Sequence, residues 1–207
     1  TIAMVIIALL SPILGAISDH SRAPRSFLKF FAVVGILGTG SLFFVSQGDY
    51  LLASFLFIIG NIGFSGGNVF YDSFLPVIAG DKKIDFISSF GFAAGYLGGG
   101  ILLAVNLAMI SKPAWFGISS KLLATKLCFL SVAVWWFIFS LPAFKLLLQK
   151  EQRTEQLSIK QYAQQGFERI AGTFRNIRKY RELFKFLIAF WLYNDGIGTI
   201  MRMATIY

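Results

Sequence analysis

Residues 51–76 read LLASFLFIIGNIGFSGGNVFYDSFLP, a long apolar run with small and polar residues set into it. The run is continuous and lacks the alternation of a half-buried strand, which favours a helix. The hydrocarbon core of a membrane is roughly 30 Å thick, and a helix needs about 20 apolar residues to cross it. The sequence therefore predicts a transmembrane helix at 51–74.

The same pattern recurs along the chain. Hydrophobic residues make up 56% of the 207 and charged residues only 14%, whereas a soluble domain carries about 25% charge. We therefore predict an all-α, polytopic membrane protein whose partner is the lipid bilayer. Its six predicted transmembrane helices span 1–18, 27–47, 51–74, 87–110, 123–144 and 184–207.

Lysine and arginine predict the orientation of these helices. Fifteen of the 19 basic residues follow the first, third and fifth predicted helices, and three lie in or beside the other loops. The positive-inside rule places the fifteen in the cytoplasm, so the first helix enters from outside. The net charge of +9 thus indicates cytoplasmic loops, and we expect no nucleic-acid partner.

The connection 145–183 holds nine of these basic residues, and Lys185 follows it directly. Apolar residues recur in it at helical spacing: Ala163, Phe167, Ile170, Phe174 and Ile177. This pattern predicts an amphipathic helix with a basic face. Such a helix can rest on anionic headgroups or tie together two halves of a transporter, and the two interpretations are compatible.

Polar residues form a stripe on the predicted helix 51–74. They recur at spacings of four, three and four, with a tyrosine beside them: Asn61, Ser65, Asn68, Asp72 and Tyr71. Lipid would disfavour such a stripe, so it should face protein or water. We predict that it lines a cavity; the alternative is hydrogen bonding between helices without a ligand.

A second polar stripe lies on the predicted helix 184–207, within YNDGIGTIMR. Its candidate cavity residues are Tyr193, Asn194, Asp195, Thr199 and Arg202. Asp195 would lie near mid-membrane, where an unpaired charge costs at least a few kcal/mol. We predict a transport site here. The alternative is a structural ion pair between Asp195 and Arg202, about 10 Å apart along the axis at 1.5 Å per residue.

Glycines recur at spacings of four in two of the predicted helices. They are Gly63 and Gly67 in 51–74, and Gly91, Gly95 and Gly99 in 87–110. Glycine at this spacing allows two helix backbones to approach closely. We therefore interpret these five residues as helix-packing positions.

The turn after the first predicted helix carries a carboxylate and two guanidinium groups. Its residues of interest are Gly15, Asp19, Arg22 and Arg25. Charge-assisted hydrogen bonds from these groups could latch neighbouring helix ends and form a cytoplasmic gate. Ordinary positive-inside flanking would explain the arginines but not Gly15 or Asp19.

No motif in the sequence indicates catalysis. The chain has one histidine and one cysteine, and neither a P-loop, a nucleophile elbow nor a dinucleotide-binding fingerprint is present. We therefore predict no metal, no cofactor and no enzymatic activity.

The turn Gly15–Arg25 resembles the signature between the second and third helices of the major facilitator superfamily. That placement implies that the chain is a fragment covering helices two to seven of twelve. Residues 1–144 would belong to the N-terminal half, 145–183 to the central cytoplasmic loop, and 184–207 to the C-terminal half. The two polar stripes would then lie on helices four and seven, which line the cavity in that superfamily.

Three stretches resemble a narrower, permease-like branch related to the fungal vacuolar amino-acid effluxers of autophagy. They are NVFYDSFLP at 68–76, SSFGFAAGYLGGG at 88–100 and FWLYNDGIGT at 190–199. The resemblance implies a secondary active transporter that exports a small solute, such as an amino acid, by alternating access.

The expected location is the bacterial inner membrane, with the rest of the transporter chain as a partner. A proton would be the coupling ion, carried by Asp195 or Asp72, because a carboxylate removed from water can exchange a proton near neutral pH. The alternative is a non-transporting membrane scaffold or receptor.

Overall fold

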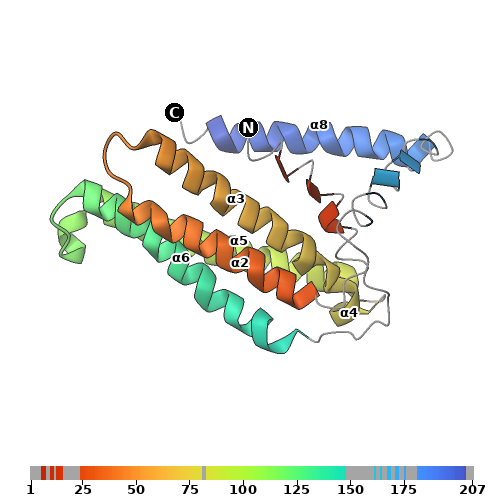
Figure 1. The fold of residues 1–207 in the computed structure, drawn as a ribbon, viewed down its shortest axis with the longest axis horizontal. Helices are drawn as coiled ribbons and strands as arrows, with labels where there is room; N and C mark the ends of the chain where they lie inside the picture. Colours follow the sequence, from red (N-terminus) through yellow and green to blue (C-terminus); the bar gives the residue numbers. More distant parts are fainter. Residues whose placement is uncertain are drawn as a thin grey trace.

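The computed structural model describes residues 24–80, 83–147 and 181–203, with shorter pieces between 6 and 15 and between 161 and 175. This part of the chain contains helices and no strands (Figure 1). The main helices are α2 (Pro24–Ser41), α3 (Tyr50–Ser73), α4 (Leu75–Ala79), α5 (Ile84–Ser111), α6 (Lys121–Leu146) and α8 (Arg181–Met203). Two short 3-10 helices, η1 (Leu42–Phe44) and η2 (Pro113–Phe116), follow α2 and α5.

Four helical stretches in the described residues are long and apolar enough to cross a membrane. They are Pro24–Phe44, Tyr50–Ala79, Ile84–Ser111 and Lys121–Leu146. They match the second to fifth predicted helices, with ends moved by a few residues, and confirm the all-α membrane fold.

The other two predicted transmembrane helices are not among these four stretches. The sixth, 184–207, falls on α8, which is helical but is not one of these four stretches because Lys185, Asn194 and Asp195 lower its mean hydropathy. The first, 1–18, and the amphipathic helix of the connection 145–183 lie mostly outside the described residues.

Helix α2 is the centre of the described bundle, because it packs against both α3 and α6. A Cβ atom on Gly63 of α3 would overlap the backbone of Gly35 in α2. One on Gly38 would lie 3.0 Å from the backbone nitrogen of Gly60. The two helices therefore cross with their backbones nearly in contact, which the lack of side chains at these positions allows.

An aromatic cluster holds the beginning of α2 against the end of α3. The Phe70 side chain is fully buried, and its ring centroid lies 5.2 Å from that of Phe27 and 5.8 Å from that of Phe31. Leu28 and Phe74 complete the buried core of the cluster. Because Phe70 is fixed, the orientation of the next turn of α3 is fixed as well.

A buried polar pair joins α5 to α6. Asn106 is 8% exposed, and its Oδ1 accepts a hydrogen bond of 2.9 Å from the hydroxyl of Ser131. Within a membrane span such a pair is favourable because neither group can bond to water. The pair therefore fixes how α5 and α6 are rotated against each other.

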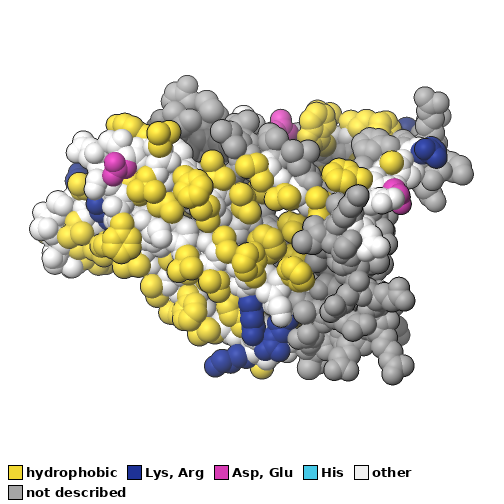
Figure 2. All heavy atoms as spheres, viewed as in Figure 1, with side chains coloured by type: hydrophobic (Ala, Val, Ile, Leu, Met, Phe, Trp, Pro, Cys, Tyr) yellow, Lys and Arg dark blue, Asp and Glu magenta, His cyan; other side chains and the backbone are white. Residues whose placement is uncertain are grey.

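The surface of the described helices is largely apolar, as a lipid-facing bundle requires (Figure 2). Leu51, for example, is 89% exposed. Basic side chains gather where α2 begins and α6 ends (Figure 2). Helix α2 carries Lys29 near its beginning, and Lys145 lies in the last turn of α6. This end is the side that the sequence places in the cytoplasm.

Candidate substrate cavity

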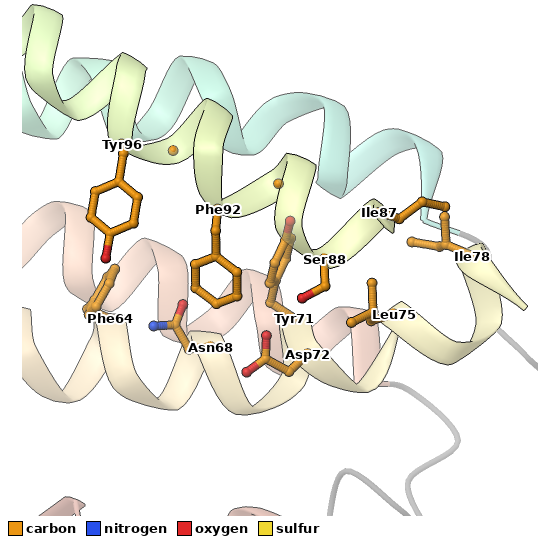
Figure 3. A pocket seen from close by; sticks show the side chains of 12 residues that line it. Phe64, Asn68, Tyr71, Asp72, Leu75, Ile78, Ile87, Ser88, Phe92 and Tyr96 are labelled. Atoms are coloured by element: carbon orange, nitrogen blue, oxygen red, sulfur yellow. The ribbon is translucent and has the colours of Figure 1, made fainter. Parts of the chain in front are cut away.

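A cavity of about 480 Å³ opens between α3, α4 and α5 (Figure 3). Its lining residues are Phe64, Asn68, Tyr71 and Asp72 from α3, Leu75 and Ile78 from α4, and Ile87, Ser88, Gly91, Phe92, Gly95 and Tyr96 from α5. This volume is typical of small-molecule sites, which run from about 300 to 1,000 Å³.

Helix α3 supplies the polar side of the cavity. Phe70 points into the aromatic cluster with α2, so the neighbouring Tyr71 and Asp72 face away from that cluster. Asn68 and Asp72, one turn apart on α3, point toward the α5 side (Figure 3). Short helix α4 continues the span and closes this end with apolar side chains.

Helix α5 supplies two of the four aromatic side chains in the described lining and leaves open volume beside them. Ser88, Phe92 and Tyr96 recur every four residues and so lie on one face. Between them, a Cβ on Gly91 would lie 4.0 Å from the Tyr71 hydroxyl oxygen, and one on Gly95 would meet nothing within 4 Å. The missing side chains of these two glycines therefore contribute to the open volume.

The charged group that the structure describes in this cavity is acidic. Asp72 is the single carboxylate among its described lining residues, which include no lysine, arginine or histidine. No ion pair joins Asp72 to another residue in the part of the chain that the structure describes. The other polar groups are the Asn68 amide and the hydroxyls of Ser88, Tyr71 and Tyr96. The cavity therefore offers hydrogen bonds and a negative charge.

A second cavity, of about 230 Å³, lies on the other side of the same α3 residues. Phe64, Asn68 and Tyr71 line both cavities, whereas the second is otherwise formed by α2, α6 and Gly67. Trp136 of α6 meets Phe64 edge-on, with ring centroids 6.0 Å apart. These three α3 residues therefore form the wall that the two spaces share.

Asn61 and Ser65, the N-terminal part of the predicted α3 stripe, do not contribute to the cavity. Asn61 donates a hydrogen bond of 2.8 Å to the carbonyl of Phe57 in its own helix. Asn61 and Ser65 are half-buried and line neither cavity. The structure thus brings Asn68, Tyr71 and Asp72 together and leaves these two apart.

The predicted packing glycines differ in how close their nearest described neighbours lie. Gly63 lies at the close crossing with α2, whereas a Cβ on Gly67 would lie 4.0 Å from that of Phe31. Gly91, Gly95 and Gly99 are exposed, and no described neighbour is closer than the Tyr71 hydroxyl. Packing at these three residues stays a prediction.

The α8 stripe does not reach the cavity in the described structure. Tyr193, Asn194, Asp195 and Thr199 are exposed, and α8 has hardly any contacts with the other described helices. It runs along the upper edge of the bundle in Figure 1. The Arg202 side chain lies outside the described residues, so the transport role of this stripe stays a prediction.

One residue of the predicted gate turn has a defined partner. Arg25 donates from Nε and Nη2 to the carbonyl oxygen of Phe144, and from Nη2 to that of Lys145. Gly15 has no neighbour within 4 Å of an added Cβ, and Asp19 and Arg22 lie outside the described residues. Arg25 therefore binds the end of α6.

Sequence reasoning missed the aromatic half of the cavity. Phe64, Phe92 and Tyr96 look like lipid-facing residues in an apolar run, and Ser88 is a single hydroxyl in it. The spacing of four shared by Ser88, Phe92 and Tyr96 is the signal that could have found them.

Four membrane-spanning helical stretches in the described residues, with a cavity that has polar groups in its lining, define a multi-pass membrane protein. The chain belongs to the family described as "Vacuole effluxer Atg22 like", whose model matches residues 1–207. This match confirms the resemblance drawn from the sequence.

Individual relatives agree with the family. The MFS-type transporter YxiO of Bacillus subtilis is 36% identical over 204 residues, which are 98% of this chain and 47% of the relative. Autophagy-related protein 22 of Yarrowia lipolytica is 24% identical over 267 residues, covering 92% of this chain and 44% of the relative. The chain thus spans less than half the length of these curated relatives. No solved structure matches it significantly.

Proposed function

We propose that the full-length protein is a secondary active transporter that moves a small solute by alternating access, with the α3–α5 cavity on the solute path. One observation carries the proposal: a carboxylate, an amide and three hydroxyls line an open cavity in a bundle whose surface is largely apolar. Polar groups are costly against lipid, so these groups should face water, solute or another part of the protein, and an open cavity favours water or solute.

The direction and the solute class come from the relatives. The matching family is described by the words vacuole effluxer, and the sequence resembles amino-acid effluxers. We therefore propose export of an amino acid. With a relative in Bacillus subtilis, the proposed location is the bacterial cytoplasmic membrane, with the connection 145–183 on the cytoplasmic side.

A proton is the proposed coupling ion. The two candidate carriers are Asp72, which lines the cavity, and Asp195, which lies within the helical span of α8. In a transporter of this kind, carboxylates at the bundle interior relay protons between the two access states. Replacing the aspartate that carries the proton, Asp72 or Asp195, by asparagine should uncouple transport from the pH gradient.

The direct test is amino-acid transport by the full-length protein in proteoliposomes, with and without a pH gradient. The variants are Asp72→Asn and Asp195→Asn, with Asp85→Asn as the matched control because Asp85 is an exposed acid of α5 that lines neither cavity. We expect the control to transport normally and one of the first two to lose its response to the gradient. An unchanged response in both would overturn proton coupling at these residues, and transport no faster than in empty liposomes would overturn the amino-acid proposal.

A non-transporting scaffold would need no cavity open to water. In a Cys128→Ala background, Asn68→Cys and Asp195→Cys report on access for a membrane-impermeant thiol reagent, with the buried Ala133→Cys as control. We expect Asn68→Cys to react and Ala133→Cys to be protected. Full protection of both position 68 and position 195 would favour the scaffold.

A further inference from the structure

The lining of the α3–α5 cavity restricts the charge of its solute. Among the residues that the structure describes, Asp72 is the single charged side chain of the lining. An anionic solute would meet this carboxylate with no described basic residue to offset the repulsion. A neutral solute would remove water from the carboxylate without replacing it by a counter-charge, which is unfavourable. A cation fits on charge grounds.

The aromatic side chains narrow the class of cation. Phe64, Tyr71, Phe92 and Tyr96 line the cavity, and each is more than half exposed, from 53% for Tyr71 to 73% for Tyr96. A cation over the face of an aromatic ring is attracted by the ring quadrupole. Ca²⁺ sites use several carboxylate and carbonyl oxygens, whereas the described lining offers one carboxylate and one amide, with three hydroxyls, among four aromatic rings.

The carboxylate and two of the four rings come from different helices. Asp72 and Asn68 project from α3, and the Phe92 and Tyr96 rings come from α5 across the cavity (Figure 3). An ammonium group can therefore contact the carboxylate while the apolar part of the same molecule lies against the rings. A volume of about 480 Å³ accommodates such a molecule.

We propose that this cavity recognises its solute through a positively charged amine, with Asp72 as the counter-charge, and holds an apolar or aromatic group against Phe92 and Tyr96. The inference rests on the proposed function for the cavity's place on the solute path. An amino acid enters this class through its ammonium group. Its carboxylate would have the Asn68 amide and the nearby hydroxyls as donors but would also be repelled by the Asp72 carboxylate. An amine without a carboxylate avoids this repulsion and should bind at least as well.

Binding of three matched probes to the purified full-length protein tests this recognition. 2-Phenylethylamine carries the amine alone, 3-phenylpropionate the carboxylate alone, and L-phenylalanine both groups. Isothermal titration calorimetry should show 2-phenylethylamine binding at least as tightly as phenylalanine, with phenylpropionate about tenfold weaker or worse. Equal binding of the amine and the carboxylate would overturn the proposal.

Variants locate the binding. Asp72→Asn should weaken 2-phenylethylamine binding by about tenfold or more, because one charged partner is lost. Asp85→Asn, which removes an exposed acid outside the lining, should leave it unchanged and controls for binding to detergent or lipid. Equal affinities for the two variants, each with a normal unfolding temperature, would contradict the role of Asp72.

Two phenylalanine variants of α5 test how much the aromatic rings contribute to amine binding. Phe92→Leu should weaken amine binding by roughly threefold, because leucine keeps the apolar contact but loses the ring face. Phe86→Leu is the control, since Phe86 is 71% exposed but outside the lining.

Two further results separate this inference from the proposed function. If the protein transports an anionic or neutral solute and 2-phenylethylamine does not bind, the amine inference fails and transport stands. If no solute is transported and Asn68→Cys is protected from aqueous reagents, both fail together.

Discussion

The guanidinium group of Arg25, in the first turn of α2, caps the last turn of α6 by bonding the main-chain carbonyl of Phe144. The Nε–O distance is 2.7 Å, and Nη2 also reaches the carbonyl of Lys145 at 3.2 Å. The last carbonyls of a helix have no partner within the helix, and a cation near this end is favourable for the helix dipole. Arg25 thus joins the beginning of α2 to the end of α6.

Arg25→Ala should destabilise the full-length protein by about 1–2 kcal/mol, because hydrogen bonds from a charged donor to the half-buried carbonyl of Phe144 are lost. Arg25→Lys should recover part of this, since lysine keeps the charge but not the planar fork. The measurement is thermal unfolding in detergent. Lys29→Ala is the control, because Lys29 is an exposed basic residue one turn later on α2. Equal unfolding temperatures for Arg25→Ala and Lys29→Ala would show that the cap contributes nothing measurable.

The close crossing of α2 and α3 gives a second prediction. A methyl group on Gly63 would overlap the Gly35 backbone, whereas one on Gly67 would make ordinary contact with Phe31. Gly63→Ala should therefore cost about 1–3 kcal/mol, because the helices must separate. Gly67→Ala should be neutral or slightly stabilising, because alanine favours a helix over glycine. Unfolding temperatures in the same detergent compare the two, and an equally stable Gly63→Ala would mean that the helices are not in backbone contact.

The Asn106–Ser131 hydrogen bond gives a third prediction. In a double-mutant cycle with Asn106→Ala and Ser131→Ala, the coupling energy should be about 0.6 kcal/mol, the usual size for such bonds between membrane helices. The cycle is measured by reversible unfolding in mixed micelles. Asn106→Ala combined with Thr125→Ala is the reference cycle. The Thr125 hydroxyl bonds Lys121 in its own helix, whereas the Ser131 hydroxyl is shared between Asn106 of α5 and the Cys128 carbonyl of its own helix. Coupling no larger than in the reference cycle would place the two side chains apart in the membrane.

Much of the fold could be predicted from apolar run length alone. The predicted helices 27–47, 51–74, 87–110 and 123–144 each coincide with a span that the structure describes. A membrane makes this possible because backbone groups in lipid must be satisfied within the helix. Helix α8 was predicted as a span from the same run, although its polar residues make it less apolar than the others.

The candidate site was only partly predictable. The spacing rule placed Asn68 and Asp72 on one face of α3, which the structure brings into the cavity, but it placed Asn61 there too. Asn61 instead bonds a carbonyl one turn earlier, an option that a sequence pattern cannot rank against a cavity. The role of α5 depends on which face turns toward α3, and its weak periodicity does not settle this. Its glycines therefore fit a packing face and a cavity wall equally well.

A larger side chain at Gly95 distinguishes whether the α5 glycines form a cavity wall or a helix-packing face. Gly95 lines the cavity and an added Cβ would meet nothing within 4 Å, so Gly95→Leu should fold and occupy solute space. Overfilling a site costs about 1–3 kcal/mol, so solute affinity and transport should fall roughly tenfold. Gly99→Leu is the matched control, because Gly99 has the same open surroundings but lies outside the lining.

Transport in proteoliposomes and unfolding in detergent separate the outcomes. Loss of transport in Gly95→Leu alone, with both variants stable, supports a cavity wall. Destabilisation of both variants would instead show that the glycine face of α5 packs against another helix of the full-length protein, as the spacing of four also predicts. Normal transport by a stable Gly95→Leu would place the solute path elsewhere, since a leucine side chain on the cavity wall must exclude part of any solute that binds there.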